Sequence, residues 1–189
     1  MALGDVDRFH RFARPYDLLM PPARRTALNA GLAHADRDVE RMLDLAGGSG
    51  RAARRVSVPD PVVVDAARGM VRRARGHGLA AVQGDACRLP IRDESVDAVV
   101  IVDALHHVVD AADAFAQARR VLRPGGVLVV REFDPTTVRG RALVAAERLV
   151  GFRSQFWPPD ALADLIAESG LDAAVVERGF GYTVVGTNR

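Results

Sequence analysis

Four short apolar runs, each ending in an aspartate, constrain the fold of this chain more than any other feature. They end at Asp44, Asp65, Asp85 and Asp103. The runs are too short for helices, and their β-branched residues favour buried strands. Successive aspartates are 21, 20 and 18 residues apart, which is the length of a strand, a crossover helix and two turns. The spacing predicts a repeated βαβ unit.

Helical segments are predicted between these runs, at residues 50–56, 67–77 and 110–122, and a further strand at 127–130 follows a break at Pro124-Gly125-Gly126. Parallel strands joined by helices require right-handed crossovers. We therefore expect an α/β fold of the Rossmann-like, doubly wound kind, with a mainly parallel sheet and helices on both faces.

The C-terminal part differs in pattern. Helices are predicted at 143–150 and 159–169, and strands at 172–178 and 182–187. The two strands are joined by three residues, which is too short for a parallel crossover. The sheet should therefore end in an antiparallel hairpin, and residues 1–189 should form a single domain.

Composition excludes several classes of protein. All 26 basic residues are arginines, yet the formal net charge is only +2, so no clustered basic face for nucleic acid is expected. The single cysteine, Cys87, offers neither a disulfide nor a metal cluster, and no metal site is predicted. Residues 1–7 lack a signal-peptide pattern, and no apolar run is long enough to span a membrane. We expect a cytoplasmic protein.

A glycine-rich loop at residues 43–50, Leu-Asp-Leu-Ala-Gly-Gly-Ser-Gly, joins the first strand to the next segment. Glycines allow a tight turn and a close approach of a ligand to the backbone. Gly48, Gly50 and Ala53 also fit the GxGxxA form of a dinucleotide fingerprint. The loop alone therefore leaves a nicotinamide cofactor and S-adenosylmethionine both open.

The four aspartates favour S-adenosylmethionine. In an open parallel sheet the ligand lies beyond the carboxyl ends of the strands, so all four should border one crevice. Asp65, fifteen residues after Gly50, is placed to accept hydrogen bonds from ribose hydroxyls, and Asp85 with the Ala86 amide could bind the adenine edge. Carboxylates tolerate a sulfonium and an amine but repel a pyrophosphate. The alternative for each aspartate is a helix N-cap or a solvated strand end.

Several motifs together resemble the class I S-adenosylmethionine-dependent methyltransferases, and within them the ubiquinone/menaquinone-biosynthesis C-methyltransferase group. The glycine loop in its Leu-Ala-Gly-Gly-Ser-Gly form carries the likeness to the quinone group. The motifs are Phe12-Ala13-Arg14-Pro15-Tyr16-Asp17, residues 43–50, Gly84-Asp85-Ala86 with Leu89-Pro90 and Asp93, residues 95–108, and Val121-Leu122-Arg123-Pro124-Gly125-Gly126.

The resemblance implies a cofactor site and its surroundings. Residues 1–36 would form a helical arm over the cofactor, with Tyr16 closing the site or, alternatively, packing the arm. Residues 135–158 would form a substrate-side insert, smaller than in the quinone enzymes. The residues implied at the cofactor are Asp44, Ala46, Gly47, Gly48, Gly50, Asp65, Ala66, Asp85, Ala86, Val102, Asp103 and Ala104.

Methyl transfer is an in-line displacement that depends mainly on positioning. A base helps when the acceptor is an oxygen or an activated ring carbon, and His106 and His107 are the candidates. Adjacent residues do not easily face one pocket, so we expect one of them to contact substrate. The alternative is a histidine bonded to backbone at the sheet edge. Apolar side chains of the insert could form a lid over a small, apolar or quinone-like acceptor, although core packing is the better explanation for most of them: Leu143, Leu149, Phe152, Phe156 and Trp157.

The sequence thus predicts a transferase of class EC 2.1.1, with three alternative functions. A cofactor-binding protein without turnover would have the same motifs. An NAD(P)-dependent oxidoreductase would want a catalytic lysine, which this chain lacks. RNA methylation would want a basic stripe with stacking aromatics. Peripheral membrane contact, through Arg139, Arg141 and Arg153, and a homodimer both stay open.

Overall fold

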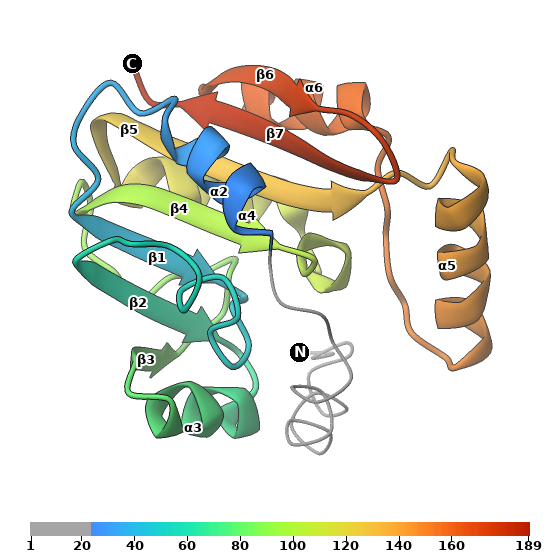
Figure 1. Cartoon of the computed structure of the whole chain (residues 1–189), viewed down its shortest axis with the longest axis horizontal. Coiled ribbons are helices and arrows are strands. Elements are labelled where there is room, and N and C mark those ends of the chain that lie inside the picture. Colours follow the sequence, from blue (N-terminus) through green and yellow to red (C-terminus); the bar gives the residue numbers. More distant parts are fainter. Residues whose placement is uncertain (1–23) are drawn as a thin grey trace.

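The computed structural model describes residues 24–189, and in this part of the chain a seven-stranded sheet runs through the molecule in the order β3-β2-β1-β4-β5-β7-β6 (Figure 1). The strands from β3 to β5 are parallel, whereas β7 pairs antiparallel with both β5 and β6. The strand bounds are β1 Arg41–Leu45, β2 Asp60–Asp65, β3 Ala80–Gln83, β4 Val96–Val102, β5 Leu122–Phe133, β6 Asp172–Glu177 and β7 Gly181–Thr187.

Helices cover both faces of the sheet. α2 (Arg25–Leu32) and α3 (Arg68–Gly76) pack on one face, and α4 (Ala111–Val121) and α6 (Pro159–Glu168) pack on the other. Successive side chains of β4 point to opposite faces of the sheet. Val99 packs in the core on the α4 and α6 side, and Val100 packs in the core on the α2 and α3 side. The predicted Rossmann-like, doubly wound architecture with its C-terminal antiparallel hairpin is confirmed.

The predicted helix at residues 50–56 is wrong, because this segment forms turns. The Arg54 amide donates to the Gly50 carbonyl at 3.0 Å as in a helix. The Ala53 amide, however, donates to the Asp44 carboxylate at 3.0 Å. A side chain from β1 thus takes a donor that helix propagation would use.

The predicted break at Pro124-Gly125-Gly126 does not precede a strand but lies within one, since β5 already begins at Leu122. The irregularity is a bulge instead, with the register against β4 shifting between Val96 and Ala98. Gly125 has φ +76° there. Its carbonyl accepts from the Asp36 amide, and its amide donates to the Asn188 carbonyl. A bulge absorbs the extra residues without breaking the sheet.

α5 (Val138–Leu149) begins five residues before its predicted start. The Thr137 hydroxyl caps it by accepting from the Gly140 amide at 3.0 Å. Figure 1 shows α5 set apart from the sheet, beyond the carboxyl end of β5. Among residues 24–189, no helix is both long and apolar enough to cross a bilayer.

Asp97, at the amino end of β4, holds the opposite edge of the sheet together. Its Oδ1 accepts from Arg37 and Arg123 at 2.9 Å each, and its Oδ2 accepts from the Arg41 amide at 2.8 Å. Burial favours the neutral acid, yet the Arg41 amide and Arg123 hold the pKa of Asp97 below its usual value. This carboxylate is fully partnered.

Candidate functional site

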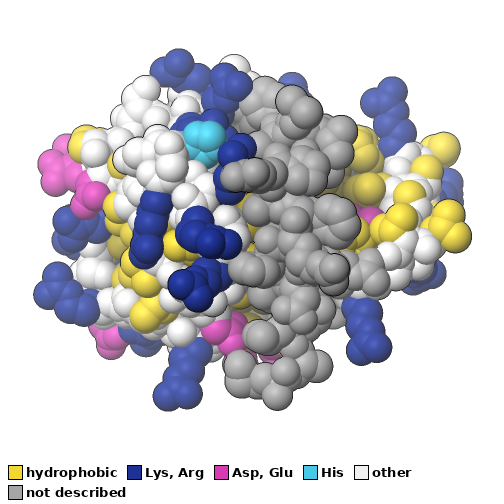
Figure 2. Space-filling model, turned by 90° about the horizontal axis from the view of Figure 1, so that it is seen from below, with side chains coloured by type: hydrophobic (Ala, Val, Ile, Leu, Met, Phe, Trp, Pro, Cys, Tyr) yellow, Lys and Arg dark blue, Asp and Glu magenta, His cyan; other side chains and the backbone are white. Residues whose placement is uncertain are grey.

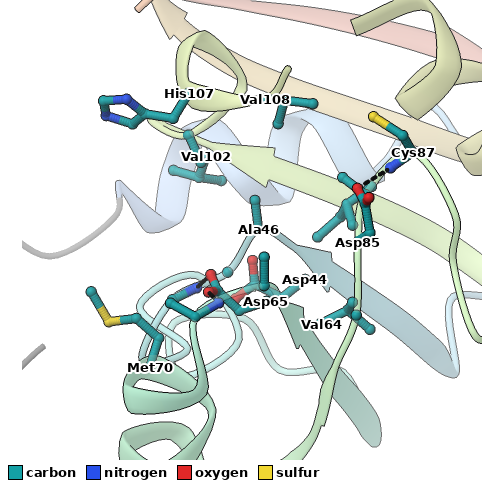
Figure 3. Close-up of a pocket in the computed structure, with 18 of the residues that line it drawn as sticks. Asp44, Ala46, Val64, Asp65, Met70, Asp85, Cys87, Val102, His107 and Val108 are labelled. Atoms are coloured by element: carbon teal, nitrogen blue, oxygen red, sulfur yellow. Dashed lines mark hydrogen bonds between the residues drawn. The ribbon is translucent and has the colours of Figure 1, made fainter. Parts of the chain in front are cut away.

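A cavity of about 500 Å³ opens at the carboxyl ends of β1, β2 and β4. Figure 3 shows Asp44, Ala46 and Asp65 on one side of it, Val102 and His107 on another, and Asp85 on a third. Most of the predicted cofactor residues line it: Asp44, Ala46, Gly47, Gly48, Asp65, Ala66, Asp85, Ala86, Val102, Asp103 and Ala104. The crevice expected from the strand-end aspartates is therefore present as one space.

Three predicted site residues are not found in the lining of this cavity. Gly50 is buried and has φ +81°, and a Cβ there would collide with the Leu79 side chain. His106 is buried behind the cavity wall. Tyr16 lies outside the described residues.

The backbone is unusual where β1 and β4 end. Ala46 has φ +53° and Asp103 has φ +51°, a left-handed conformation that non-glycine residues rarely adopt. Both residues line the cavity. Strain at two neighbouring strand ends that face one cavity is typical of a ligand-binding site.

Asp44 is buried and only half satisfied. Its Oδ2 accepts from the Ala53 amide at 3.0 Å, but its Oδ1 has no partner among the described residues. Burial raises the pKa of Asp44 to about 7. An unpartnered buried carboxylate oxygen is costly unless a ligand donates to it. Gly47 packs so closely that a Cβ there would meet the Asp44 carboxylate, so the loop and this side chain form one cradle.

Asp65 connects the glycine loop to the following helix. Its Oδ2 accepts from the Gly48 amide and its Oδ1 from the Ala67 amide, both at 2.8 Å. Each oxygen keeps a second lone pair for a ligand hydroxyl. Burial raises the pKa of Asp65 in spite of these two bonds. The alternative of a helix N-cap is not realised, because the N-cap of α3 is Ala67 and has no side-chain cap.

Asp103 has a partner that the sequence did not predict. Arg51 approaches its Oδ2 at 3.4 Å, while Oδ1 is buried without a partner among residues 24–189. Burial, followed by the nearby Glu132 charge, raises the pKa of Asp103. Asp44 and Asp103 both line the cavity, and each has one buried oxygen without a partner in the described part of the chain.

The third side of the cavity is more open. Asp85 is exposed, and its carboxylate accepts from the Cys87 amide at 2.9 Å (Figure 3). Ala86, between them in the chain, also lines the cavity. Met70 of α3 and Val108 add apolar surface to the lining. Neither was predicted as a site residue. The place of Met70 in the first turn of the helix after Asp65 was the available signal.

His106 lies in a buried ionic cluster. Its Nδ1 is 2.8 Å from Oε2 of Glu132, its Nε2 is 3.5 Å from Glu147, and its ring stacks on Phe156. Burial opposes a charged ring, but Glu132 and Glu147 raise the pKa of His106 to about 10. Ligand-type atoms of His106, His107 and Glu147 lie within 4.8 Å of one another; a protonated His106, however, has no lone pair to offer a metal.

His107 is the histidine that lines the cavity. Its Nδ1 lies 3.3 Å from the Ser154 hydroxyl, and its ring is 5.1 Å from that of Phe152. Both partners belong to the segment after α5, so the predicted insert meets the site at this side chain. Of the adjacent histidine pair, the structure places one inside the wall and one in the cavity.

Comparison with known proteins supports the same family as the motifs. Residues 43–130 match the family model described as a methyltransferase domain. The demethylmenaquinone methyltransferase of Mycobacterium sp. (strain KMS) is 38% identical over 129 residues, 67% of this chain and 54% of that protein. The ubiquinone/menaquinone biosynthesis C-methyltransferase of Paracoccus denitrificans is 40% identical over 116 residues, 55% of this chain and 46% of that protein.

The fold is shared with solved structures. An S-adenosylmethionine-dependent methyltransferase from Thermotoga maritima superposes with a TM-score of 0.81, covering 97% of this chain and 99% of the other at 22% identity. The chain spans about half the length of the curated relatives it matches. The structural comparison shows that this chain has the class I methyltransferase fold. The sequence comparisons show that it resembles the quinone C-methyltransferases.

Proposed function

We propose that this protein transfers a methyl group from S-adenosylmethionine to a small, quinone-like acceptor. The chain has the fold of the class I methyltransferases and resembles them in sequence. One observation carries the proposal. Asp44 and Asp103 line a cavity with several glycines, and each has a buried carboxylate oxygen with no partner among residues 24–189. Such carboxylates suit a cationic cofactor and disfavour a pyrophosphate.

Each end of the cofactor has a proposed set of partners in the chain. Asp44 and Asp103 would accept from the amine, and the Gly47 and Gly48 backbone allows close approach. Asp65, which already fixes the loop through Gly48, would accept from the ribose hydroxyls. We assign the adenine to the side formed by Asp85, Ala86 and Met70, with Ala66 next to the ribose and Val102 and Ala104 below the sulfur. Bound S-adenosylmethionine supplies an electrophilic methyl group on a sulfonium.

His107 is the proposed acid–base group, because it lines the cavity and His106 does not. It would accept a proton from the acceptor as the methyl group is attacked. Ser154, whose hydroxyl lies 3.3 Å from Nδ1, would fix the orientation of the ring. His106, held as an imidazolium by Glu132, would act as a positioning residue for its neighbour.

The acceptor class rests on the relatives and on the lining. Of the curated relatives described above, one is named a demethylmenaquinone methyltransferase and the other a ubiquinone/menaquinone biosynthesis C-methyltransferase. The part of the cavity near His107 is apolar, with Val102, Val108 and Val109. Residues 135–158 bring Phe152 and Ser154 to the same place, which supports the proposal that they form a substrate-side insert. Within the predicted arm at residues 1–36, α2 packs on the sheet and no residue of 24–36 lines the cavity. We therefore propose an arm over the cofactor only for residues 1–23, with Tyr16.

Calorimetric titration with S-adenosylmethionine and S-adenosylhomocysteine tests the cofactor, with NADH as the control ligand. We expect micromolar binding of the sulfur ligands and at least a tenfold loss in Asp65→Ala, while Asp164→Ala on the exposed side of α6 binds normally. Mass spectrometry of demethylated quinol analogues incubated with the protein then tests transfer. Tight NADH binding with no sulfur-ligand binding would refute the assignment, whereas cofactor binding without any methylated product would favour a protein without turnover.

A further inference from the structure

The face of α5 that points away from the protein is apolar. Val138 and Leu149 are 77% and 88% exposed. With the exposed Ala142 and Ala145 they follow a spacing of four, three and four residues, so all four lie on one side of the helix. A surface helix of a globular protein normally turns its apolar side chains toward the core. In α5, by contrast, the stripe that faces outward is apolar.

The opposite face of the same helix is the one that contacts the protein. Gly140 is buried, with no room for a Cβ against the Asp134 carbonyl. Leu143, Val144 and Glu147 are half buried, and Glu147 reaches His106. α5 is thus attached through its inner face, and its outer apolar stripe does not belong to the core.

Arginines flank the outer stripe on both sides. Arg139 borders one edge, and Arg141 and Arg148, seven residues apart on one line of the helix, border the other. Arg153 follows in the next segment, and all four are exposed. Against these four cations the segment 138–153 holds one carboxylate, Glu147. Figure 2 shows this end of the molecule as exposed hydrophobic side chains with arginines among them.

We propose that the outer face of α5 docks on an anionic lipid bilayer. A surface-lying helix has an apolar stripe that enters the acyl boundary and basic side chains at its borders that reach the headgroups. The charge pattern favours this occupant over a second copy of the chain, because two such faces would bring like-charged arginines together. The docking stands on these residues alone.

The outer face of α5 lies near the proposed acceptor site, so docking would bring the bilayer close to that site. This functional role of the docking rests on the proposed function. The segment after α5 carries Phe152 and Ser154, which contact His107 of the cavity. A bilayer held against the outer face of α5 would lie next to the part of the molecule that receives the acceptor. A lipid-soluble acceptor would then not have to cross water to reach the site.

Co-sedimentation of the full chain with vesicles tests the proposal without cofactor or acceptor. We expect binding to vesicles of phosphatidylglycerol and phosphatidylcholine, weak binding to phosphatidylcholine alone, and loss of binding at high salt. Each arginine near an anionic surface contributes roughly a fivefold gain in partitioning. Arg139→Gln with Arg141→Gln should therefore weaken binding about 25-fold, whereas the matched pair Arg68→Gln with Arg72→Gln on α3 should change it less than threefold.

A second variant separates the apolar contribution. Leu149→Ser should weaken vesicle binding several-fold, while Val82→Ser on the edge strand β3 should leave it unchanged. Absence of binding to anionic vesicles, or equal binding by both arginine pairs, overturns the proposal. A concentration-dependent dimer that Leu149→Ser abolishes, without vesicle binding, overturns it in favour of self-association. Because the assay contains no S-adenosylmethionine, failure of the methyltransferase assignment would not affect its result.

Discussion

Asp44 should make cofactor binding depend on pH, because its carboxyl group must lose a proton before it can pair with an ammonium group. Burial raises its pKa from the ordinary 3.8 to about 7. Well below that pKa, each unit of pH lowers the ionised fraction about tenfold. We therefore expect the affinity for S-adenosylmethionine to fall about tenfold between pH 6 and pH 5, where an α-amine with a pKa near 8 stays charged.

Calorimetry measures both the affinity and the proton. Titrations at pH 5, 6 and 7, each in two buffers of different ionisation enthalpy, should reveal release of close to one proton per ligand bound at pH 6. Asp44→Asn should bind more weakly at pH 7 and lose most of the pH dependence. Asp164→Asn, the same change on an exposed part of α6, should behave as the unaltered chain does.

Two results would refute this reasoning about Asp44. One is an affinity that does not change between pH 5 and pH 7. The other is an Asp44→Asn variant that keeps the full slope, which would transfer the titration to Asp65 or Asp103, whose pKa values burial also raises.

Three further predictions follow from the site. Gly47→Ala places a Cβ 2.7 Å from Asp44 Oδ1, so cofactor affinity measured by calorimetry should fall at least tenfold, while Gly76→Ala, with nothing within 4 Å, should not alter it. Glu132→Gln breaks a buried pair and should lower the free energy of unfolding in urea by about 3 kcal/mol at pH 7, unlike Glu168→Gln. Because the pKa of His106 is raised to about 10, the pair's stabilisation is full below the unfolded pKa near 6.5 and is lost as pH rises through 10; a deficit of Glu132→Gln that persists above pH 10 would contradict the pairing. His107→Gln should lower kcat about 100-fold with cofactor affinity unchanged; an unaffected kcat, as expected for His34→Gln, would remove His107 from the chemistry.

The sheet and the cavity could be predicted from sequence because their signals are local. Runs of β-branched residues ending in Asp44, Asp65 and Asp103 define strand ends, and topology then brings these ends to one edge. The hairpin followed from a connection too short for any alternative. These inferences needed no knowledge of which side chains touch.

The ionic cluster around His106 could not be predicted in this way. Glu132 is 26 residues from His106 in sequence, and Glu147 lies on α5, still further along the chain. The role of each histidine therefore depended on contacts that only the folded chain defines. Arg51 is similar, since its approach to Asp103 depends on turns where a helix was expected.

Asp97 lies near the start of β4, and Asp103 directly follows its end. Within the described part of the chain, only Asp97 of these two has hydrogen-bond partners for both carboxylate oxygens. Asp97 has two arginines and a backbone amide, whereas Asp103 keeps an oxygen with no partner in the described part of the chain. The residue that stabilises the fold and the residue at the cavity are therefore about 20 Å apart along one strand, at roughly 3.3 Å per residue. Substitutions that change ligand preference at one end would leave the charge network at the other intact, so this architecture can acquire new ligands without being refolded around them.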